Sequence, residues 1–252
     1  MKKLMSLIMC IVFLVSLTAC SESSATDFTV KKVAVSADDN AYFAAREFVN
    51  TLENAECVSY NTSSDVVIAV ENSKADYAVL DEFEYNNFIR MQRNISIHSR
   101  CEFTLDYCAY FSNGNHDLSQ AFNYALSHLK SAGIIDKIVK CYSEGGVYEA
   151  SPSTGEKGEL IMLCDPYFEY INYLDSEGNN AGIEIAIARE ICSYLGYSLQ
   201  IATADFDELF MKLQNGDGDF VMSGAVYNEE RAGYYISSDI YFTRNYYVVN
   251  RK

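Results

Sequence analysis

The sequence predicts an α/β fold in two segments, and three observations lead to this prediction. The chain has 252 residues, 49% hydrophobic and 13% aromatic, which suffices for one large domain or two small ones. From Phe28 onward, short apolar runs alternate with helical patterns. A stretch rich in glycine and small polar residues at 146–158 interrupts this alternation, which then resumes. The pattern therefore predicts one α/β segment on each side of a linker.

The first segment begins with an apolar run at 30–36, which precedes a helical pattern at 41–55. A second apolar run at 64–83 precedes a helical pattern at 84–92. Strands that alternate with helices of this length imply right-handed βαβ units and a mostly parallel sheet.

Two helices close the first segment, at 118–133 and 135–144, and Gly133 is expected to end the first of them. After the linker, apolar runs and helical patterns alternate again: LIMLC, IEIAIAREICSYLGY, LQIATA, FDELFMKLQNG, DFVMSGAV and YYVVNRK. The second segment is therefore predicted to be α/β as well.

The charge balance argues against a nucleic-acid partner. The chain carries 35 acidic and 19 basic residues, a formal net charge of −16, and has no stripe of lysine and arginine. Phosphate binding needs a clustered positive field. Motifs of known enzyme classes (HExxH, GxSxG, P-loop, GxGxxG) do not occur, and His98, His116 and His128 have no ligand spacing. The sequence predicts neither an enzyme nor a cofactor or metal site.

The first twenty residues, MKKLMSLIMCIVFLVSLTAC, are typical of a secretory signal. The uncharged run at 4–19 is shorter than the roughly 20 residues that a spanning helix needs. Its ending, LTAC, resembles the lipobox of bacterial lipoproteins. The resemblance implies a signal peptide at 1–19, a lipid on Cys20 and a tether at 20–28 that holds the protein on the extracytoplasmic face of the cell membrane. The alternative is an ordinary signal peptide in which Cys20 is incidental.

Six further cysteines follow the predicted lipidation site. Export permits disulfides, and no pair has the CxxC spacing of a metal or redox site. Small buried apolar side chains are the favoured interpretation. These cysteines are Cys57, Cys101, Cys108, Cys141, Cys164 and Cys192.

Motifs of the second segment occur in a fixed order: DPYF, GIEIAIA, FDELFMKLQNGDGD, NEER and ISSDIYF. In this order they resemble the first lobe of the family 3 extracellular solute-binding proteins, the amino-acid-binding components of ABC importers. In the first segment, ENSKADYAVLDEFE resembles a second-lobe strand of that family. The stretch at 113–144 resembles its closing helices.

The resemblance implies a two-lobed α/β fold of the type II periplasmic-binding-protein-like class, with its parts in an unusual order. In the family the lobe with the arginine motif comes first, whereas here it comes last. We therefore predict a circular permutant whose old termini are joined through the linker. The alternative is a fragment of a tandem array or a swapped dimer. Since the new ends would cut one interlobe strand, only the crossing near 105–112 is expected to join the lobes.

This interpretation divides the mature chain into four parts. The second lobe is expected at 29–106, and the hinge return with the closing helices of the first lobe at 107–145. The linker is expected at 146–158 and the first lobe at 159–252.

A free amino acid has two charges that need partners once it leaves water. The resemblance implies that Arg231 grips the α-carboxylate through a bidentate fork. The alternative is a solvated helix arginine that pairs with Glu229 or Glu230. Backbone at Gly224 and Val226 is implied to supply a carbonyl for the ammonium and an N–H for the carboxylate.

Three other side chains complete the implied ligand site. Asp81 is implied to receive the ammonium, although an acidic residue after a strand is more usually a helix cap. Phe168 and Phe206 are implied to sandwich the ligand side chain, and either ring could instead belong to the core.

The sequence departs from the family at two places in this site. Asp38, Asp39 and Asn40 replace a G-T-T stretch whose groups help to bind the carboxylate, and Asn228 replaces a threonine before Arg231. Extra acids near a bound carboxylate would repel it unless they point outward or the ligand is cationic.

The resulting prediction is a membrane-anchored protein that captures a small-molecule ligand, an amino acid or related amine, and delivers it to an ABC permease. The alternative is a non-transport sensor or interaction lipoprotein with a degenerate or unusual ligand site, which the altered G-T-T stretch favours. A lytic enzyme that carries this fold as a module is a third, weaker interpretation.

Overall fold

The computed structural model describes residues 30–37 and 40–252. The predicted signal peptide at 1–19, the tether at 20–28, Cys20 and the pair Asp38–Asp39 lie outside the described residues. Within that part of the chain, no helix combines the length and the apolar character needed to cross a membrane.

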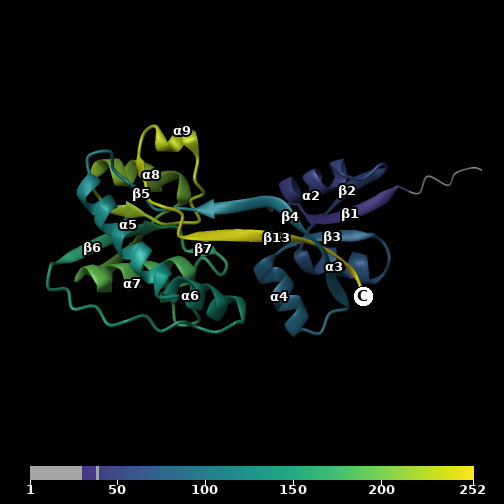
Figure 1. The fold of residues 1–252 in the computed structure, drawn as a ribbon, viewed down its shortest axis with the longest axis horizontal. Coiled ribbons are helices and arrows are strands. Elements are labelled where there is room, and N and C mark those ends of the chain that lie inside the picture. The colour runs from purple at the N-terminus through teal and green to yellow at the C-terminus, as the bar shows by residue number, and fades with distance from the viewer. Residues whose placement is uncertain (1–29, 38–39) are drawn as a thin grey trace, which may run out of the picture. The chain divides into compact units, whose positions relative to one another are not determined.

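The second lobe is built on a five-stranded sheet of order β2-β1-β3-β13-β4 (Figure 1). Strand β1 lies between β2 and β3, and its residues Val33, Ala34 and Val35 have no exposed surface, as is typical of a strand covered on both faces. The elements of this lobe are β1 (Lys31–Ser36), α2 (Ala41–Asn50), β2 (Ala55–Tyr60), α3 (Ser63–Glu71), β3 (Tyr77–Asp81), α4 (Glu82–Arg90), β4 (Ile95–Tyr107) and β13 (Phe242–Arg251).

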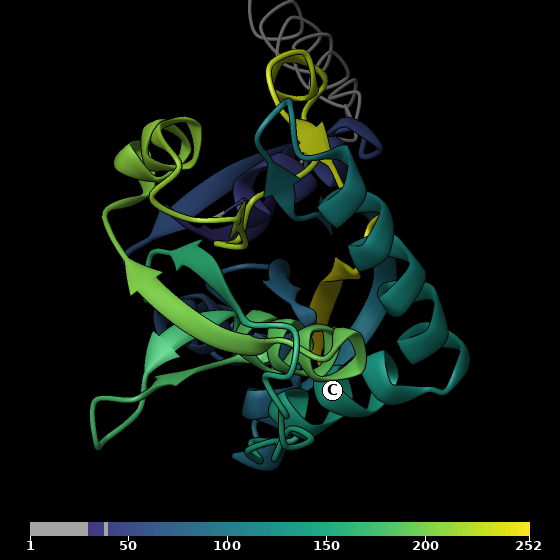
Figure 2. The same ribbon diagram turned by 90° about the vertical axis from the view of Figure 1, so that its left-hand side faces the viewer.

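The first lobe is built on a second five-stranded sheet of order β10-β6-β11-β5-β12 and a small sheet of order β7-β8-β9. Figure 2 looks onto this lobe, with α5 and α6 as teal coils along one side. The elements are β5 (Tyr110–Phe111), α5 (His116–Ser131), α6 (Ile134–Ser143), β6 (Glu159–Cys164), β7 (Tyr167–Phe168), β8 (Asn172–Leu174), β9 (Asn180–Ala181), α7 (Ile183–Leu195), β10 (Ser198–Thr203), α8 (Phe206–Asn215), β11 (Phe220–Val221), α9 (Glu229–Ala232) and β12 (Ile236–Ser237).

The two-lobed α/β architecture is confirmed, but the prediction of mostly parallel sheets is wrong. In the second lobe, β1 pairs in parallel with β2 and β3, whereas β13 runs antiparallel to β3 and β4. In the first lobe, β6 pairs in parallel with β10 and β11, whereas β5 runs antiparallel to β11 and β12. Both sheets are mixed because strands that arrive from the other lobe join them antiparallel.

The expectation of a single covalent crossing between the lobes is also wrong. The chain passes from β4 to β5 and again from β12 to β13, so two connections join the lobes. The strand β13 pairs with β3 and β4 and runs beside β4 in Figure 1. The C-terminal strand of the expected first lobe, 159–252, therefore lies in the sheet of the second lobe.

Local sequence patterns explain the helix boundaries. Ile135, Ile138 and Tyr142 recur at helical spacing and form the buried face of α6. Gly133 ends α5 as predicted, because it adopts the left-handed conformation (φ +71°) that glycine tolerates best. The apolar run at 64–83 divides into the helix α3 and the strand β3 rather than forming one element.

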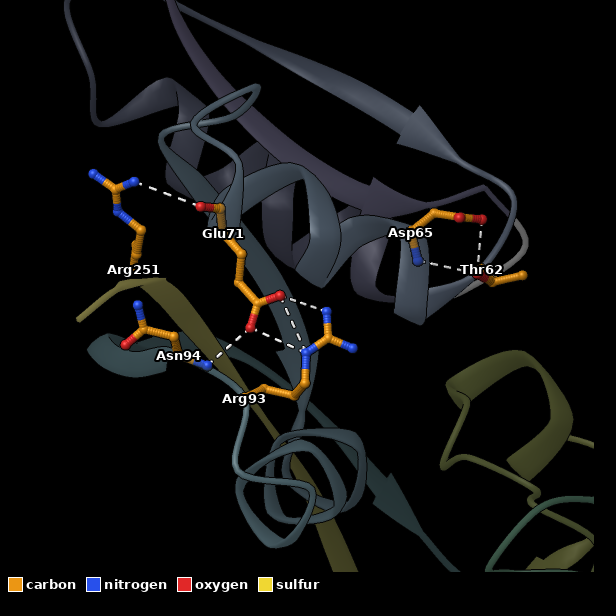
Figure 3. A network of polar contacts seen from close by, with 6 residues as sticks. All are labelled: Thr62, Asp65, Glu71, Arg93, Asn94 and Arg251. Atoms are coloured by element: carbon orange, nitrogen blue, oxygen red, sulfur yellow. Dashed lines mark hydrogen bonds and ion pairs between the residues drawn. The ribbon is translucent and has the colours of Figure 1, made fainter.

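A polar network ties the end of α3 to the start of β4 and to the C-terminal strand (Figure 3). The Glu71 carboxylate accepts the Arg93 Nε–H at 3.0 Å and the Asn94 backbone N–H at 2.8 Å. The Arg251 guanidinium donates to the Glu71 carbonyl oxygen at 3.5 Å. The hydrogen bond from Arg93 holds the pKa of Glu71 below its ordinary value. The Glu71 carboxylate and carbonyl thus connect the end of α3 to the start of β4 and to the last residue of β13.

All six cysteines of the described residues are free thiols, in agreement with the favoured interpretation. Cys101, Cys108, Cys164 and Cys192 are buried. Burial raises the pKa of Cys164 and Cys192 to about 12, so these thiols stay protonated and unreactive at neutral pH.

Candidate functional site

The loop between β11 and α9 carries Gly224 and Val226, and a buried acid holds it in place. Glu184 lies in α7 with no exposed surface, and each of its carboxylate oxygens is 3.0 Å from the Gly224 nitrogen. Asn172 and Tyr241 also donate hydrogen bonds to this carboxylate. Burial raises the pKa of Glu184. An acid inside the apolar run IEIAIA was the signal that could have identified this residue.

Tyr110 holds the other end of the same loop. Its hydroxyl donates to the Val226 carbonyl at 3.0 Å and accepts the Asn228 backbone N–H at 3.1 Å. Burial raises the pKa of Tyr110 to about 12, which keeps the hydroxyl neutral and able to donate. Neither bond uses the Gly224 carbonyl or the Val226 N–H, the two groups that were predicted to face a ligand.

Arg231 is positioned by α9, whose first turn Asn228 caps: the Asn228 side chain accepts the Arg231 backbone N–H at 3.0 Å. The guanidinium donates to the Val226 carbonyl at 3.2 Å. It lies 4.5 Å from the centroid of the Phe210 ring, 5.3 Å from that of Tyr110 and 5.9 Å from that of Phe206.

No carboxylate within the described residues forms an ion pair with Arg231. Arg231 therefore does not pair with Glu229 or Glu230, as the alternative interpretation had it. A half-buried guanidinium held on aromatic rings can still donate hydrogen bonds to an anion such as a carboxylate.

Asp165 stands beside this cluster, and the sequence prediction missed it. Its Oδ2 accepts the Phe206 backbone N–H at 3.1 Å, and its own backbone N–H donates to the Ser223 hydroxyl at 2.8 Å. Its Oδ1 is buried and has no hydrogen-bond partner within the described residues. A buried acceptor without a donor is costly. Its position directly after the buried strand β6 was the available signal.

Phe168 packs directly on Gly224. A Cβ atom at Gly224 would lie 2.7 Å from Phe168 Cδ1, and Gly224 has a φ of +61°, so both contact and conformation call for glycine. The other neighbour of the Phe168 ring is Arg244 of β13, whose guanidinium carbon lies 5.4 Å from the ring centroid.

Asp81 does cap a helix, as the alternative interpretation had it. Its Oδ1 accepts the backbone N–H groups of Phe83 at 2.7 Å and Glu84 at 2.9 Å, and Glu84 completes a capping box. The other carboxylate oxygen forms a buried ion pair with Arg244. The carboxylate predicted to receive a ligand ammonium therefore already faces a cation of the chain itself. The sequence prediction missed Arg244, although an arginine inside the apolar C-terminal strand was visible.

Asn40 lies at the start of α2 in the second lobe. It precedes α2 without a side-chain cap, and its carbonyl accepts the Phe43 backbone N–H at 3.0 Å. Its neighbour Asp39 lies outside the described residues.

The structure thus sorts the predicted site into two groups. Arg231, Phe206, Val226 and Asn228 gather around Tyr110 in the first lobe. Asp81 lies on the second-lobe sheet with Arg244. Gly224 and Phe168 connect them, because the Phe168 ring contacts Gly224 on one side and the Arg244 guanidinium on the other.

Comparison with known proteins identifies relatives of the second segment. The model of the "Bacterial extracellular solute-binding proteins, family 3" matches residues 160–252. The "Arginine-binding extracellular protein ArtP" of Bacillus subtilis (strain 168) is 28% identical over 104 residues, which are 41% of this chain and 41% of that protein.

Two further similarities concern parts of other proteins. The "Membrane-bound lytic murein transglycosylase F" of Citrobacter koseri is 32% identical over 82 residues, 32% of this chain and 16% of that enzyme. The arginine-bound form of domain 1 from TmArgBP is 29% identical and has a TM-score of 0.34, covering 41% of this chain and 87% of that chain. The chain therefore spans less than half the length of ArtP and of the transglycosylase.

Proposed function

Because residues 160–252 belong to the bacterial extracellular solute-binding proteins, family 3, we propose that the chain captures a small polar solute, an amino acid, between its two lobes. The observation that carries the proposal is Arg231. Its guanidinium is held over Phe210, donates to the Val226 carbonyl and forms no ion pair within the described residues, so donors remain for a carboxylate. Two lobes joined by two strands can close on such a ligand by a hinge motion.

The surroundings of Arg231 support a ligand that also carries a cation. Asp165 has a buried carboxylate oxygen without a donor in the described part of the chain, and its other oxygen accepts the Phe206 backbone N–H. ArtP and the TmArgBP domain are described as arginine-binding and arginine-bound. Cationic amino acids are therefore the first ligands to test.

A thermal-shift screen over the twenty amino acids, agmatine and common polyamines tests the proposal. A ligand at about 100 times its Kd adds about 2.7 kcal/mol to the free energy of unfolding, which is a clear shift in Tm. We expect the shift to disappear in Arg231→Ala. The matched control is Arg189→Ala, an exposed arginine of the same lobe, in which the shift should persist. A shift that persists in Arg231→Ala would contradict the role of this residue.

We extend the proposal to delivery and anchoring. Lipid on Cys20 would hold the chain at the outer face of the membrane, where a cognate ABC permease would receive the solute. Cys20→Ser is expected to release the protein into the medium and to abolish incorporation of labelled palmitate. Cys57→Ser is the matched control, because Cys57 is a free thiol of the folded chain. Lipid incorporation that survives Cys20→Ser would contradict the anchor.

We also propose that the lobe order arose by circular permutation. Support comes from the C-terminal strand β13, which crosses from the first lobe into the second-lobe sheet that also contains β1. A chain that starts at 159 and connects 252 to 30 through a flexible linker is expected to keep the free energy of unfolding and the ligand response. Failure of this chain to fold would favour the tandem-array or swapped-dimer alternative.

A specific observation favours the second candidate function, a sensor or interaction lipoprotein. Asp81 is already paired with Arg244, so it is not free to receive a ligand ammonium. This candidate predicts that no solute in the screen shifts the Tm of the wild type. The transglycosylase match gives less support to an enzyme, because it spans only 16% of that protein.

A further inference from the structure

Arg244 lies in an unusual environment for an arginine of a β-strand. It is 7% exposed, and its guanidinium forms an ion pair with Asp81, which has no exposed surface. The guanidinium carbon lies 5.7 Å from the centroid of the Phe83 ring and 5.4 Å from that of Phe168. The Asp81 carboxylate and the Phe83 and Phe168 rings contact this cation, and Tyr107 and Glu82 lie close enough to interact with its charge.

These contacts come from three separate parts of the chain. Asp81 and Phe83 lie at the junction of β3 and α4, in the second lobe. Phe168 belongs to β7 of the first lobe, and Arg244 comes from the crossing strand β13. A planar guanidinium that pairs with a carboxylate and faces aromatic rings is the preferred chemistry for recognising this group.

The two rings are held from behind. Gly224 leaves just enough room for Phe168, since a Cβ there would lie 2.7 Å from the ring. Phe83 stacks on Tyr170 of the first lobe, with ring centroids 5.3 Å apart and an interplanar angle of 15°. Tyr170 sits in the β7–β8 turn with a φ of +65°, a strained conformation for a residue with a bulky side chain. Contacts with Gly224 and Tyr170 thus hold the two rings independently of Arg244.

Structural need does not account for a charge at this point. The register of β13 is set by pairing on both sides, with β3 and with β4, and Arg244 itself lies opposite Leu105. Buried ion pairs are often no more stabilising than apolar side chains of similar volume. The stability of the strand therefore does not explain a cation at this position, whereas recognition of a guanidinium group would.

We propose that Asp81, Phe83 and Phe168 form a guanidinium-binding site whose occupant is the chain's own Arg244. A free ligand with a guanidinium group enters this site only when the Arg244 side chain leaves it. The site is distinct from the carboxylate-binding group at Arg231, so the inference does not depend on which solute the first lobe captures.

Removal of the occupant tests the proposal. In Arg244→Ala, the vacated site is expected to bind methylguanidinium, seen as a rise in Tm and as heat in a calorimetric titration at millimolar ligand. The wild type at the same concentration controls for the denaturing effect of the salt and is expected to show no rise. N-methylurea has nearly the same shape without the charge and is expected to give no shift. An identical response of Arg244→Ala and wild type to methylguanidinium would overturn the proposal.

A second pair of variants separates the site from a general stability effect. Asp81→Asn combined with Arg244→Ala removes the carboxylate and should lose the response to methylguanidinium. Arg244→Met fills the space with an apolar side chain and should also fail to respond. If Arg244→Ala does not fold alone, its refolding yield is measured with and without methylguanidinium. Rescue by methylguanidinium supports the site, whereas equal yields with methylguanidinium and N-methylurea refute it.

Discussion

Arg231 and Arg244 are both held against aromatic rings, but only Arg244 meets a carboxylate. The Arg231 guanidinium carbon lies 4.5 Å from the centroid of the Phe210 ring, and the guanidinium donates to the Val226 carbonyl. Arg244 lies between Phe83 and Phe168 and is paired with Asp81. The same side-chain type therefore has two environments: Arg231 has no carboxylate partner within the described residues, whereas Arg244 is ion-paired within the fold.

The largest expected effect comes from breaking the buried pair. Asp81→Asn keeps an acceptor for the cap of α4 but removes the carboxylate that is ion-paired with Arg244, so the free energy of unfolding should fall by about 3 kcal/mol. Urea unfolding measures this change. Asp65→Asn is the matched control, an exposed acid in the first turn of α3, and should cost less than about 0.5 kcal/mol. Equal losses in the two variants would show that the Asp81 pair is not special.

The next effect concerns the loop that positions Arg231. Tyr110→Phe removes the hydroxyl that bridges the Val226 carbonyl and the Asn228 N–H. The Asn228 N–H loses its acceptor, while the Val226 carbonyl keeps the hydrogen bond from Arg231, so the free energy of unfolding should fall by about 1–2 kcal/mol. Amide exchange at Asn228 should also become faster. Tyr124→Phe, at a tyrosine that is 61% exposed, should change neither measurement. Unchanged exchange at Asn228 in Tyr110→Phe would contradict this role of the hydroxyl.

A smaller loss of stability is expected at Arg231 itself. Arg231→Ala removes a ring contact and a hydrogen bond to a carbonyl but leaves no buried charge, so it should cost no more than about 1 kcal/mol. Denaturant unfolding, compared with Arg189→Ala, checks this value. A cost as large as that of Asp81→Asn would mean that Arg231 is chiefly structural.

The smallest effect is expected for the partly exposed Arg93–Glu71 pair, in contrast to the buried Arg244–Asp81 pair. Arg93 holds the pKa of Glu71 below its ordinary value of 4.5, so this pair stabilises the fold above pH 4.5 and its contribution is lost as the pH falls through the lowered pKa. Arg93→Gln should therefore cost less than about 1 kcal/mol near neutral pH, and the difference from wild type should shrink in acid.

Urea unfolding between neutral pH and acid measures this difference. Lys140→Gln is the control, because the Lys140–Glu144 pair is largely exposed and should show no such dependence. A difference between Arg93→Gln and wild type that grows as the pH falls would have the wrong sign for a lowered pKa.

Much of the fold followed from local patterns. Buried runs such as VAV in β1 and the helical spacing of Ile135, Ile138 and Tyr142 depend only on neighbours in the chain. The mixed sheets did not follow, because the apolar pattern of YYVVN does not reveal which strands β13 joins. The same strand overturned the expectation of one crossing between the lobes.

The candidate site was predictable to a similar degree. The motifs placed Gly224, Asn228 and Arg231 in one loop and the helix that follows it. In the structure, Asn228 accepts the Arg231 N–H and Glu184 accepts the Gly224 N–H. Glu184, Tyr110 and Asp165 were missed, since each acts through a partner more than 30 positions away. Asp81 was predicted to be either a helix cap or a ligand group. Neither prediction included its ion pair with Arg244.

By itself, the sequence determined the alternation of strands and helices and the residues that start α9. These properties depend on spacing, burial preference and capping, which act over a few residues. Only the tertiary structure decided that Arg244 faces Asp81, 163 positions away, and that Phe168 of the other lobe covers the same guanidinium. The antiparallel register of β13 with β3 brings these charges together, and no local rule specifies that register.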